Sequence, residues 1–359
     1  MTRLVFITPK VDPADDLFGH IHGWVSALAA RVERLHVITL WDSAAPLPAN
    51  VTLQSMGKGR GESGGGGASK AVWLVSLQRH LLRALRRGQA DAVVSHMGPI
   101  FAVAAAPLAR LTRTPGYLWY AHGHVSPMLR LAYALVDGVA TSTPEGFRIR
   151  GARPFLTGQG IDTRRFAPRR ESSEGGGLLS VGRYSPIKDY ETLIDAVALL
   201  PAERRPRVTV VGGAHSAGDR SYRAALARRA ERSSLGETVT LCEGRPYWSM
   251  PTVYQDSGLF ATCSRTGSLD KAVLESIAAG VPPLVCNPAF RALFGDLWPR
   301  LSFQAGDARA LAERLNDWLT LDGARRRAAI EPLGARVQSE HSVEHWADRM
   351  VAMVGAAQA

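Results

Sequence analysis

The sequence predicts an α/β protein made of two doubly wound, Rossmann-like domains that face each other across a cleft. The chain has 359 residues, of which 46% are apolar and 21% charged, so it contains enough apolar material for two cores. Short β-branched runs alternate with longer helical patterns. A stretch rich in Pro, Gly and Ser over residues 168–177 interrupts this rhythm, which then starts again. We therefore expect domains over 1–167 and 168–343, and a helix over 344–359 that crosses back to the first.

The first half of the chain reads as a series of βαβ units. Each short apolar run precedes a segment with helical periodicity. We expect strands at residues 4–7, 36–40, 92–95, 116–120 and 138–141, and helices at 23–32, 70–88 and 100–111. The glycine-rich segment 57–69 has neither a GxGxxG nor a Walker spacing, so we interpret it as a loop rather than a phosphate cradle.

The second half repeats the pattern. We expect strands at residues 178–181, 208–213, 239–241, 258–262 and 283–286, and helices at 189–200, 221–233 and 271–279. Because doubly wound sheets bind ligands outside the carboxyl ends of their strands, we expect the functional residues on the loops that follow these strands.

Composition excludes several classes of protein. The three cysteines are isolated, which argues against a disulfide framework or a structural zinc site. No run approaches the roughly 18 apolar residues of a membrane span, and the N-terminal apolar run is too short for a signal peptide. We expect a cytoplasmic protein, with peripheral attachment to the inner face of the cell membrane as one option.

The net charge of +11 is unevenly distributed. Residues 1–170 contain 21 basic and 10 acidic residues, whereas the two signs balance in the remainder. Such asymmetry suggests that the first domain faces an acidic partner, either an anionic membrane or a phosphorylated acceptor. We do not expect nucleic acid as a partner.

The helix predicted within 70–88 bears on this question. Its apolar residues and its arginines occupy different faces, as in an interfacial helix and also in a core helix with a solvated rim. We favour the core helix because a strand follows at once and the helix must pack on its sheet.

Two loops of the second half carry residues that suit an anionic ligand. Arg183 and Lys188 lie between a strand and a helix, where two cations and free amides can converge on a diphosphate. The alternative is a pair of solvated cations. Farther on, Glu275 lies about one turn into a helix that begins near Asp270, and its carboxylate can accept hydrogen bonds from a ribose diol. The alternative is a solvated helix glutamate.

Two further loops are candidates for nucleotide contacts. Gly213 follows a strand in Val211-Gly212-Gly213, where glycine permits close backbone approach. Arg245 lies in the loop 243–247, which offers main-chain groups to a base.

Together these motifs resemble the family 4 glycosyltransferases, which have the GT-B fold. Residues 182–190 look like the family's GR-x-x-x-x-K segment, residues 274–282 like LEAMA-x-G-x-P, and residues 158–166 like NGID-x-x-x-F. The resemblance covers nearly the whole chain. It implies that Arg183 and Lys188 hold the diphosphate of a nucleotide-sugar donor and that Glu275 binds its ribose.

The chain departs from the family pattern in two places. Gly267 occupies the position of the family's first glutamate, in a TGS-x-DK wording that marks a branch of the family. Our candidates for the lost sugar contact are Asp270, Lys271 or the amides around Ser268 and Leu269. Asp270 is equally interpretable as a plain helix N-cap.

The second departure lies near the first strand, where only Gly19 of the family's glycine pair is present. His20 follows it, and either narrows the approach of the phosphate or contacts the acceptor. His122 resembles the histidine that the family turns toward the donor sugar, and His124 is a candidate acceptor contact. The alternative for these histidines is a structural or merely exposed role.

The resemblance implies a retaining hexosyltransferase. We expect it to act in cell-envelope polysaccharide or glycolipid biosynthesis, on a glycan or glycolipid acceptor. Alternatives are glycosylation of a soluble small-molecule natural product, a nucleotide-sugar epimerase, and a catalytically inactive GT-B binding protein. No cofactor and no obligatory metal are expected, because no metal-ligand spacing occurs and the two cations can neutralise the leaving diphosphate.

Overall fold

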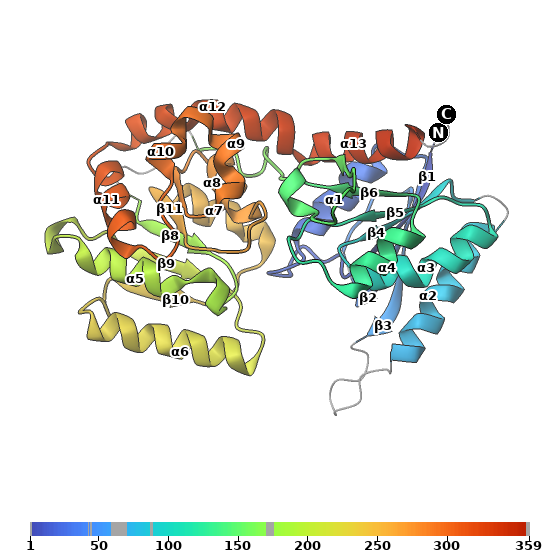
Figure 1. Cartoon of the computed structure of the whole chain (residues 1–359), viewed down its shortest axis with the longest axis horizontal. Helices are drawn as coiled ribbons and strands as arrows, with labels where there is room; N and C mark the ends of the chain where they lie inside the picture. The colour runs from blue at the N-terminus through green and yellow to red at the C-terminus, as the bar shows by residue number, and fades with distance from the viewer. Residues whose placement is uncertain are drawn as a thin grey trace. The chain divides into compact units, whose positions relative to one another are not determined.

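A computed structural model describes residues 2–41, 43, 45–58, 70–86, 89–169 and 176–356. The chain divides into two compact units, Met1–Gly160 with Val343–Ala359, and Ile161–Ser342 (Figure 1). The predicted boundary between residues 167 and 168 lies beyond this division, because Ile161 and Phe166 already belong to the core of the second unit. Much of the predicted loop 57–69 and of the stretch 168–177 lies outside the described residues.

The first unit contains a seven-stranded parallel sheet with the strand order β3-β2-β1-β4-β5-β6-β7. The order reverses at β1, whose Val5 pairs with His36 on one side and Val93 on the other. The strands are β1 (Arg3–Thr8), β2 (Arg34–Trp41), β3 (Val51–Lys58), β4 (Ala92–His96), β5 (Gly116–Trp119), β6 (Gly138–Thr141) and β7 (Phe155–Leu156).

Helices pack on this sheet through separate apolar clusters. They are α1 (His20–Ala29), α2 (Lys70–Leu85), α3 (Pro99–Leu111), α4 (Pro127–Leu135), the short 3₁₀ helix η2 (Pro144–Gly146) and α13 (Val343–Ala356). The last of these comes from the C-terminal end of the chain. Its Trp346 stacks on Trp24 of α1 with ring centroids 4.1 Å apart, and Trp24 in turn contacts Trp119 edge-on. Helix α13 therefore completes the core of the first unit.

Helix α2 packs in a different apolar cluster of the first unit, which confirms the core-helix interpretation that we favoured. Trp73, Leu77 and Leu81 are buried against the sheet and α3, while Arg79 and Arg83 lie on the exposed face. Within the described part of the chain, no helix is long and apolar enough to cross a membrane.

The second unit contains a five-stranded parallel sheet with the order β10-β9-β8-β11-β12. Its strands are β8 (Leu178–Val181), β9 (Val208–Val211), β10 (Val239–Cys242), β11 (Leu259–Thr262) and β12 (Pro283–Val285). The order reverses between β8 and β11, which Ser180 links through a 2.6 Å hydrogen bond from its hydroxyl to the Ala261 carbonyl. Ligands of doubly wound sheets bind at such a reversal.

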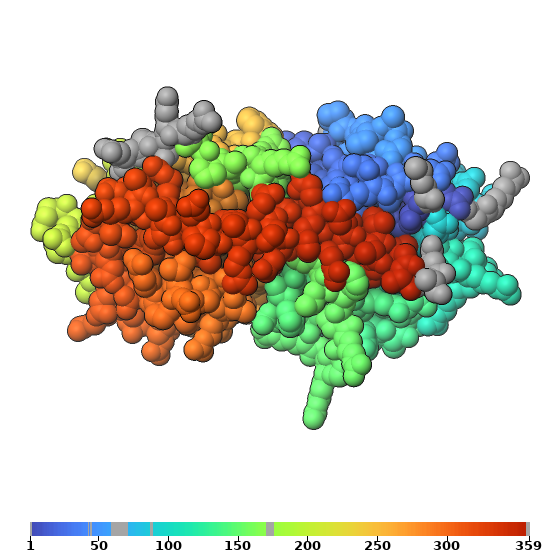
Figure 2. Space-filling view, turned by 90° about the horizontal axis from the view of Figure 1, so that it is seen from above, coloured from blue at the N-terminus to red at the C-terminus, as the bar shows by residue number. Residues whose placement is uncertain are grey.

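The α-helices of the second unit are α5 (Tyr190–Leu199), α6 (Ala217–Arg232), α7 (Met250–Gln255), α8 (Lys271–Ala278), α9 (Arg291–Phe294), α10 (Trp298–Leu301), α11 (Ala308–Leu319) and α12 (Gly323–His341). The 3₁₀ helices are η3 (Pro186–Lys188), η4 (Ala202–Arg204), η5 (Tyr247–Ser249), η6 (Pro288–Phe290) and η7 (Gly295–Leu297). The space-filling view shows α12 on one face of this unit and α13 on one face of the first (Figure 2).

The first residue of some helices is set by an N-capping side chain rather than by the start of the apolar periodicity. Helix α6 starts before the predicted residue 221 because Ser216 and Asp219 form a reciprocal capping box. Helix α4, which the periodicity did not predict, follows Ser126, whose hydroxyl accepts a hydrogen bond from the Leu129 amide.

Candidate functional site

Two glycines shape the loop after β8. Gly182 has a φ of +155°, a conformation that side chains disfavour. At Gly212, a Cβ atom would lie 2.0 Å from the carbonyl oxygen of Gly182, so only glycine permits this approach of the two strand ends. The Tyr190 hydroxyl donates a 2.6 Å hydrogen bond to the same carbonyl oxygen. The backbone that precedes Arg183 and Lys188 is thereby held in place.

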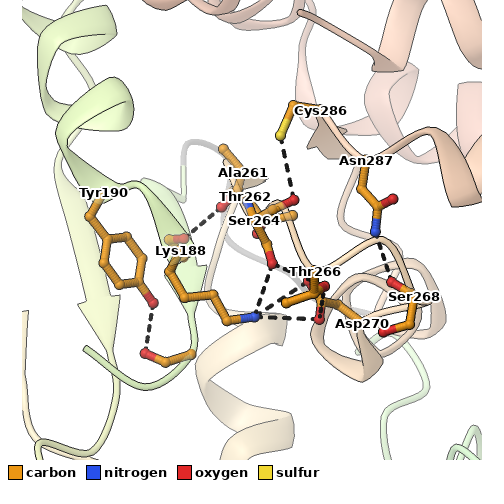
Figure 3. Close-up of polar contacts among 12 residues, drawn as sticks. Lys188, Tyr190, Ala261, Thr262, Ser264, Thr266, Ser268, Asp270, Cys286 and Asn287 are labelled. Atoms are coloured by element: carbon orange, nitrogen blue, oxygen red, sulfur yellow. Dashed lines mark hydrogen bonds and ion pairs between the residues drawn. The ribbon is translucent and has the colours of Figure 1, made fainter. Parts of the chain in front are cut away.

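The side chain of Lys188 extends from this loop to the segment after β11 (Figure 3). Its Nζ is 3.4 Å from the hydroxyl of Ser264 and 3.4 Å from each carboxylate oxygen of Asp270. The Lys188 and Asp270 side chains are 17% and 16% exposed. The solvated-cation interpretation is therefore wrong for Lys188, which forms a largely buried ion pair at the reversal of strand order.

The Thr266–Lys271 segment places Asp270 for this contact. The Thr266 hydroxyl donates to Asp270 Oδ1 at 3.4 Å, and Asn287 donates a 2.7 Å bond to the Ser268 carbonyl (Figure 3). Asp270 stands at the N-cap position of α8, but its side chain makes no capping hydrogen bond. The plain N-cap interpretation is therefore wrong, because the carboxylate is directed to Lys188 and Thr266 instead of the helix amides.

Glu275 is 5% exposed, so it is not a solvated helix glutamate. Tyr247 and Tyr254 donate hydrogen bonds of 3.1 and 3.0 Å to its two carboxylate oxygens. Burial raises the pKa of Glu275, and the two tyrosine hydrogen bonds and the nearby charge of Lys271 oppose that shift. Each oxygen keeps acceptor capacity for a further hydroxyl.

Lys271 occupies the first position of α8, where the helix dipole disfavours a cation. Burial lowers the pKa of Lys271 to about 8, although the carboxylates of Glu275 and Asp270 act in the opposite direction. A cation in so unfavourable a position is typical of a functional site.

The other predicted site residues of the second unit differ in their exposure to solvent. Arg183 and Arg245 are exposed, so the solvated-cation alternative stays open for Arg183. Gly213 is buried, and its carbonyl accepts a 3.0 Å bond from the Tyr184 amide. Ser268 and Leu269 are buried beside Gly267, whose φ is +69°.

The remaining candidates belong to the first unit. Gly19 is buried just before α1, and His20 begins that helix with its ring edge-on to Trp24. His122 is exposed, and its Nδ1 accepts a 3.0 Å hydrogen bond from the His124 amide. In the neutral imidazole this bond places the proton on Nε2. The roles of these residues toward donor and acceptor stay predictions.

Sequence reasoning missed the residues that support the charged ones. Ser264 contacts Lys188, and Thr266 donates a hydrogen bond to Asp270. Tyr247 and Tyr254 donate hydrogen bonds to Glu275. The two tyrosines are seven residues apart, two helical turns, so their spacing predicts a common face once the segment is recognised as helical. No comparable signal connects Lys188 with Ser264, because their proximity depends on the pairing of β8 with β11.

In the described ranges, no group of three or more His, Cys, Asp or Glu side chains could hold a metal ion. The expectation of a metal-independent reaction stays a prediction.

Comparison with known proteins identifies the type of fold. The Anabaena protein Alr3699/HepE, solved in complex with UDP, aligns with a TM-score of 0.75 at 16% identity, over 99% of this chain and 100% of that one. Sucrose-phosphate synthase of Thermosynechococcus elongatus aligns with a TM-score of 0.79 at 16% identity, over 99% of each chain. These likenesses confirm the predicted fold class: two parallel-sheet, Rossmann-like domains of the GT-B glycosyltransferase type.

Residues 164–331 match the family model described as glycosyl transferases group 1. Mannosylfructose-phosphate synthase of Agrobacterium fabrum is 26% identical over 176 residues, which cover 43% of this chain and 38% of that protein. The aligned region thus spans less than half of this relative. The group 1 region lies in the second unit and contains Lys188, Asp270 and Glu275.

Proposed function

We propose that this protein is a retaining glycosyltransferase that moves a hexosyl group from a nucleotide-sugar donor to an acceptor hydroxyl. The observation that carries the proposal is the Lys188–Asp270 pair at the strand reversal of the second sheet, inside the group 1 match. Two structures of the similar Anabaena protein contain UDP and UDP-glucose, which supports a nucleotide-sugar donor.

The proposed chemistry follows from where charge develops. When the bond between the anomeric carbon and the diphosphate breaks, negative charge grows on the leaving group and positive charge on the sugar. In this proposal, Lys188 and Arg183 stabilise the negative charge of the leaving diphosphate without a metal. The acceptor hydroxyl attacks the face that the diphosphate leaves, and a donor phosphate oxygen takes its proton, so the anomeric configuration is retained.

The proposed donor contacts divide by chemical group. Glu275 binds the ribose, while Gly213 and Arg245 contact the nucleotide. Residues of the segment 266–271 receive the sugar, and His122 and Gly19 of the first unit are the remaining proposed donor contacts.

For the acceptor we propose a glycan or glycolipid of the cell envelope, in contact with His20 or His124. The charge excess of residues 1–170 supports an anionic acceptor, and with it a cytoplasmic protein attached to the inner face of the membrane. A small natural product is the alternative acceptor.

A nucleotide-sugar screen tests the proposal. Release of UDP or GDP is measured from their glucose, galactose and mannose conjugates, with and without acceptor extracts, and with and without EDTA. Acceptor-dependent release that EDTA does not affect is expected. Lys188→Ala should abolish it, and the product's anomeric configuration, determined by NMR, should match that of the donor.

One observation favours a second candidate, a binding protein without activity. Gly267 provides no side chain where the resemblance places a glutamate. Donor binding without release of nucleoside diphosphate, across all the acceptors, would support this candidate and contradict the transferase.

A further inference from the structure

The ammonium group of Lys188 is shared among three acceptors, and none of them is close. All three distances, to Ser264 Oγ and to the two oxygens of Asp270, are 3.4 Å. Charge-assisted N–H···O⁻ bonds usually measure about 2.7–2.9 Å. The pair is therefore held by electrostatic attraction but lacks a short hydrogen bond, and an anion that offers closer oxygens can draw the ammonium group away.

The Asp270 carboxylate has a second contact besides Lys188, also at 3.4 Å. Thr266 donates a hydrogen bond to Oδ1, and the loop that carries both residues is fastened by the bond from Asn287 to the Ser268 carbonyl. The carboxylate makes no capping bond to α8. If Lys188 moved to another anion, Asp270 would remain in place with free acceptor capacity, and a carboxylate can only accept hydrogen bonds.

A diphosphate bound by Lys188 also brings its neighbour close to Asp270. In a nucleotide sugar that neighbour is the sugar itself, which carries hydroxyl donors. The resemblance places a glutamate where this chain has Gly267, and Asp270 is the carboxylate that lies beside Lys188, the proposed diphosphate ligand.

We propose that Lys188 and Asp270 form an exchangeable pair. The donor diphosphate takes Lys188 from the carboxylate, and the freed Asp270 accepts a hydrogen bond from a hydroxyl of the donor sugar. Diphosphate binding and sugar recognition are thereby coupled. A nucleoside diphosphate without a sugar separates Lys188 from Asp270 but offers no hydroxyl to the freed carboxylate, whereas a nucleotide sugar does. This inference rests on the proposed function.

Calorimetric titration of Asp270→Asn tests the exchange. The probes are UDP, GDP and their glucose, galactose and mannose conjugates, and the conjugate that the wild type binds best is compared with its parent diphosphate. Loss of the competing charge should tighten binding of the parent diphosphate about fivefold, the scale of a partly exposed ion pair. The advantage of the conjugate over the parent should fall about tenfold, the scale of one charged hydrogen bond.

Two further variants make the result specific. Thr266→Val should leave diphosphate affinity within about twofold but reduce the advantage of the conjugate, since the carboxylate loses its support without losing its charge. Asp195→Asn is the matched control, because it breaks the Asp195–Arg229 ion pair between α5 and α6 of the same unit. It should change neither quantity.

Each contrary result has a defined meaning. Weaker or unchanged diphosphate binding by Asp270→Asn would overturn the exchange and leave Asp270 as a residue that only positions Lys188. An unchanged conjugate advantage would remove the sugar contact. If the wild type bound none of the nucleoside diphosphates, the proposed function itself would fail, and this inference with it.

Discussion

At the scale of single residues, the two cations of the loop after β8 are in different environments. Lys188 is largely buried in an ion pair, whereas Arg183 is exposed. An exposed side chain loses more conformational freedom when it binds a ligand, so the same charge contributes less net affinity. The resemblance assigns both to the diphosphate, and their environments predict unequal contributions.

We expect Lys188→Ala to weaken UDP binding by about 1.5–3 kcal/mol, the range for hydrogen bonds to charged groups, and Arg183→Ala to weaken it by less. Calorimetry with UDP measures both. Arg204→Ala, which removes an arginine that binds Asn316 away from this loop, is the control. Equal affinity in the wild type and both variants would remove these residues from the diphosphate site.

Lys271 predicts a pH dependence of stability. Its pKa in the folded protein is about 8, below its ordinary value of 10.5. Between these values the unfolded chain binds more protons than the folded one, so this group makes stability rise with pH across that window. We expect Lys271→Met to be more stable than the wild type below pH 8, and the difference to shrink as the pH rises toward 10.5.

Urea unfolding of both proteins at several pH values checks this expectation. Lys10→Met is the contrasting control, because Asp12 and Asp15 pair with Lys10 and its pKa is raised. A gap between Lys271→Met and the wild type that does not change with pH would show that the lysine is not buried as a cation.

At the scale of elements, α2 has one buried face and one exposed face. Trp73, Leu77 and Leu81 are buried, while the exposed apolar side chains Val72, Val75 and Leu82 occur on the same helix as the exposed Arg79 and Arg83. Packing in the core and contact with an anionic surface are therefore compatible, because they involve different faces of one helix.

Replacing Arg79, Arg83, Arg86 and Arg87 with glutamine should weaken association with anionic vesicles. Each basic residue near such a surface contributes about 1 kcal/mol, so together they dominate a weak attachment. Arg87 lies outside the described residues. Cosedimentation with phosphatidylglycerol and phosphatidylcholine vesicles at low and high salt measures the effect. Wild-type binding that is indifferent to lipid charge would remove the membrane from the proposal.

At the scale of the whole molecule, the core of the first unit includes α13, which follows the second unit in the sequence. Helix α13 buries Trp346 against Trp24, and Asp348 of the same helix pairs with Arg31 of the first unit at 2.6 Å. The second unit has its own core, made of residues between Ile161 and Ser342.

A chain that ends after Ser342 should therefore lose hydrogen-exchange protection in the first unit and keep it in the second. Trp346→Ala is the milder version, with an expected cost of about 3–5 kcal/mol for a buried aromatic side chain. Peptide-resolved exchange measures both. Equal loss of protection in the two units would contradict their separate cores.

The fold was predictable from local patterns, and the charged candidates were predictable from their position after strands. Strand runs such as Val208–Val211 and the repeated βαβ rhythm determine two parallel sheets, because buried parallel strands require continuous apolar runs and helical crossovers. Helix α4 was missed because it is only nine residues long and starts with a serine and a proline, residues that are also typical of a loop.

Local sequence patterns thus predict the two-domain α/β architecture and the loops that carry Lys188, Asp270 and Glu275. The partners of these side chains are visible only in the folded chain: Asp270 faces Lys188 rather than the amides of its own helix, and Glu275 lies buried between two tyrosines. These contacts join residues 21 to 82 positions apart, which come together only through the order of β8 and β11 in the sheet and the packing of α7 against α8.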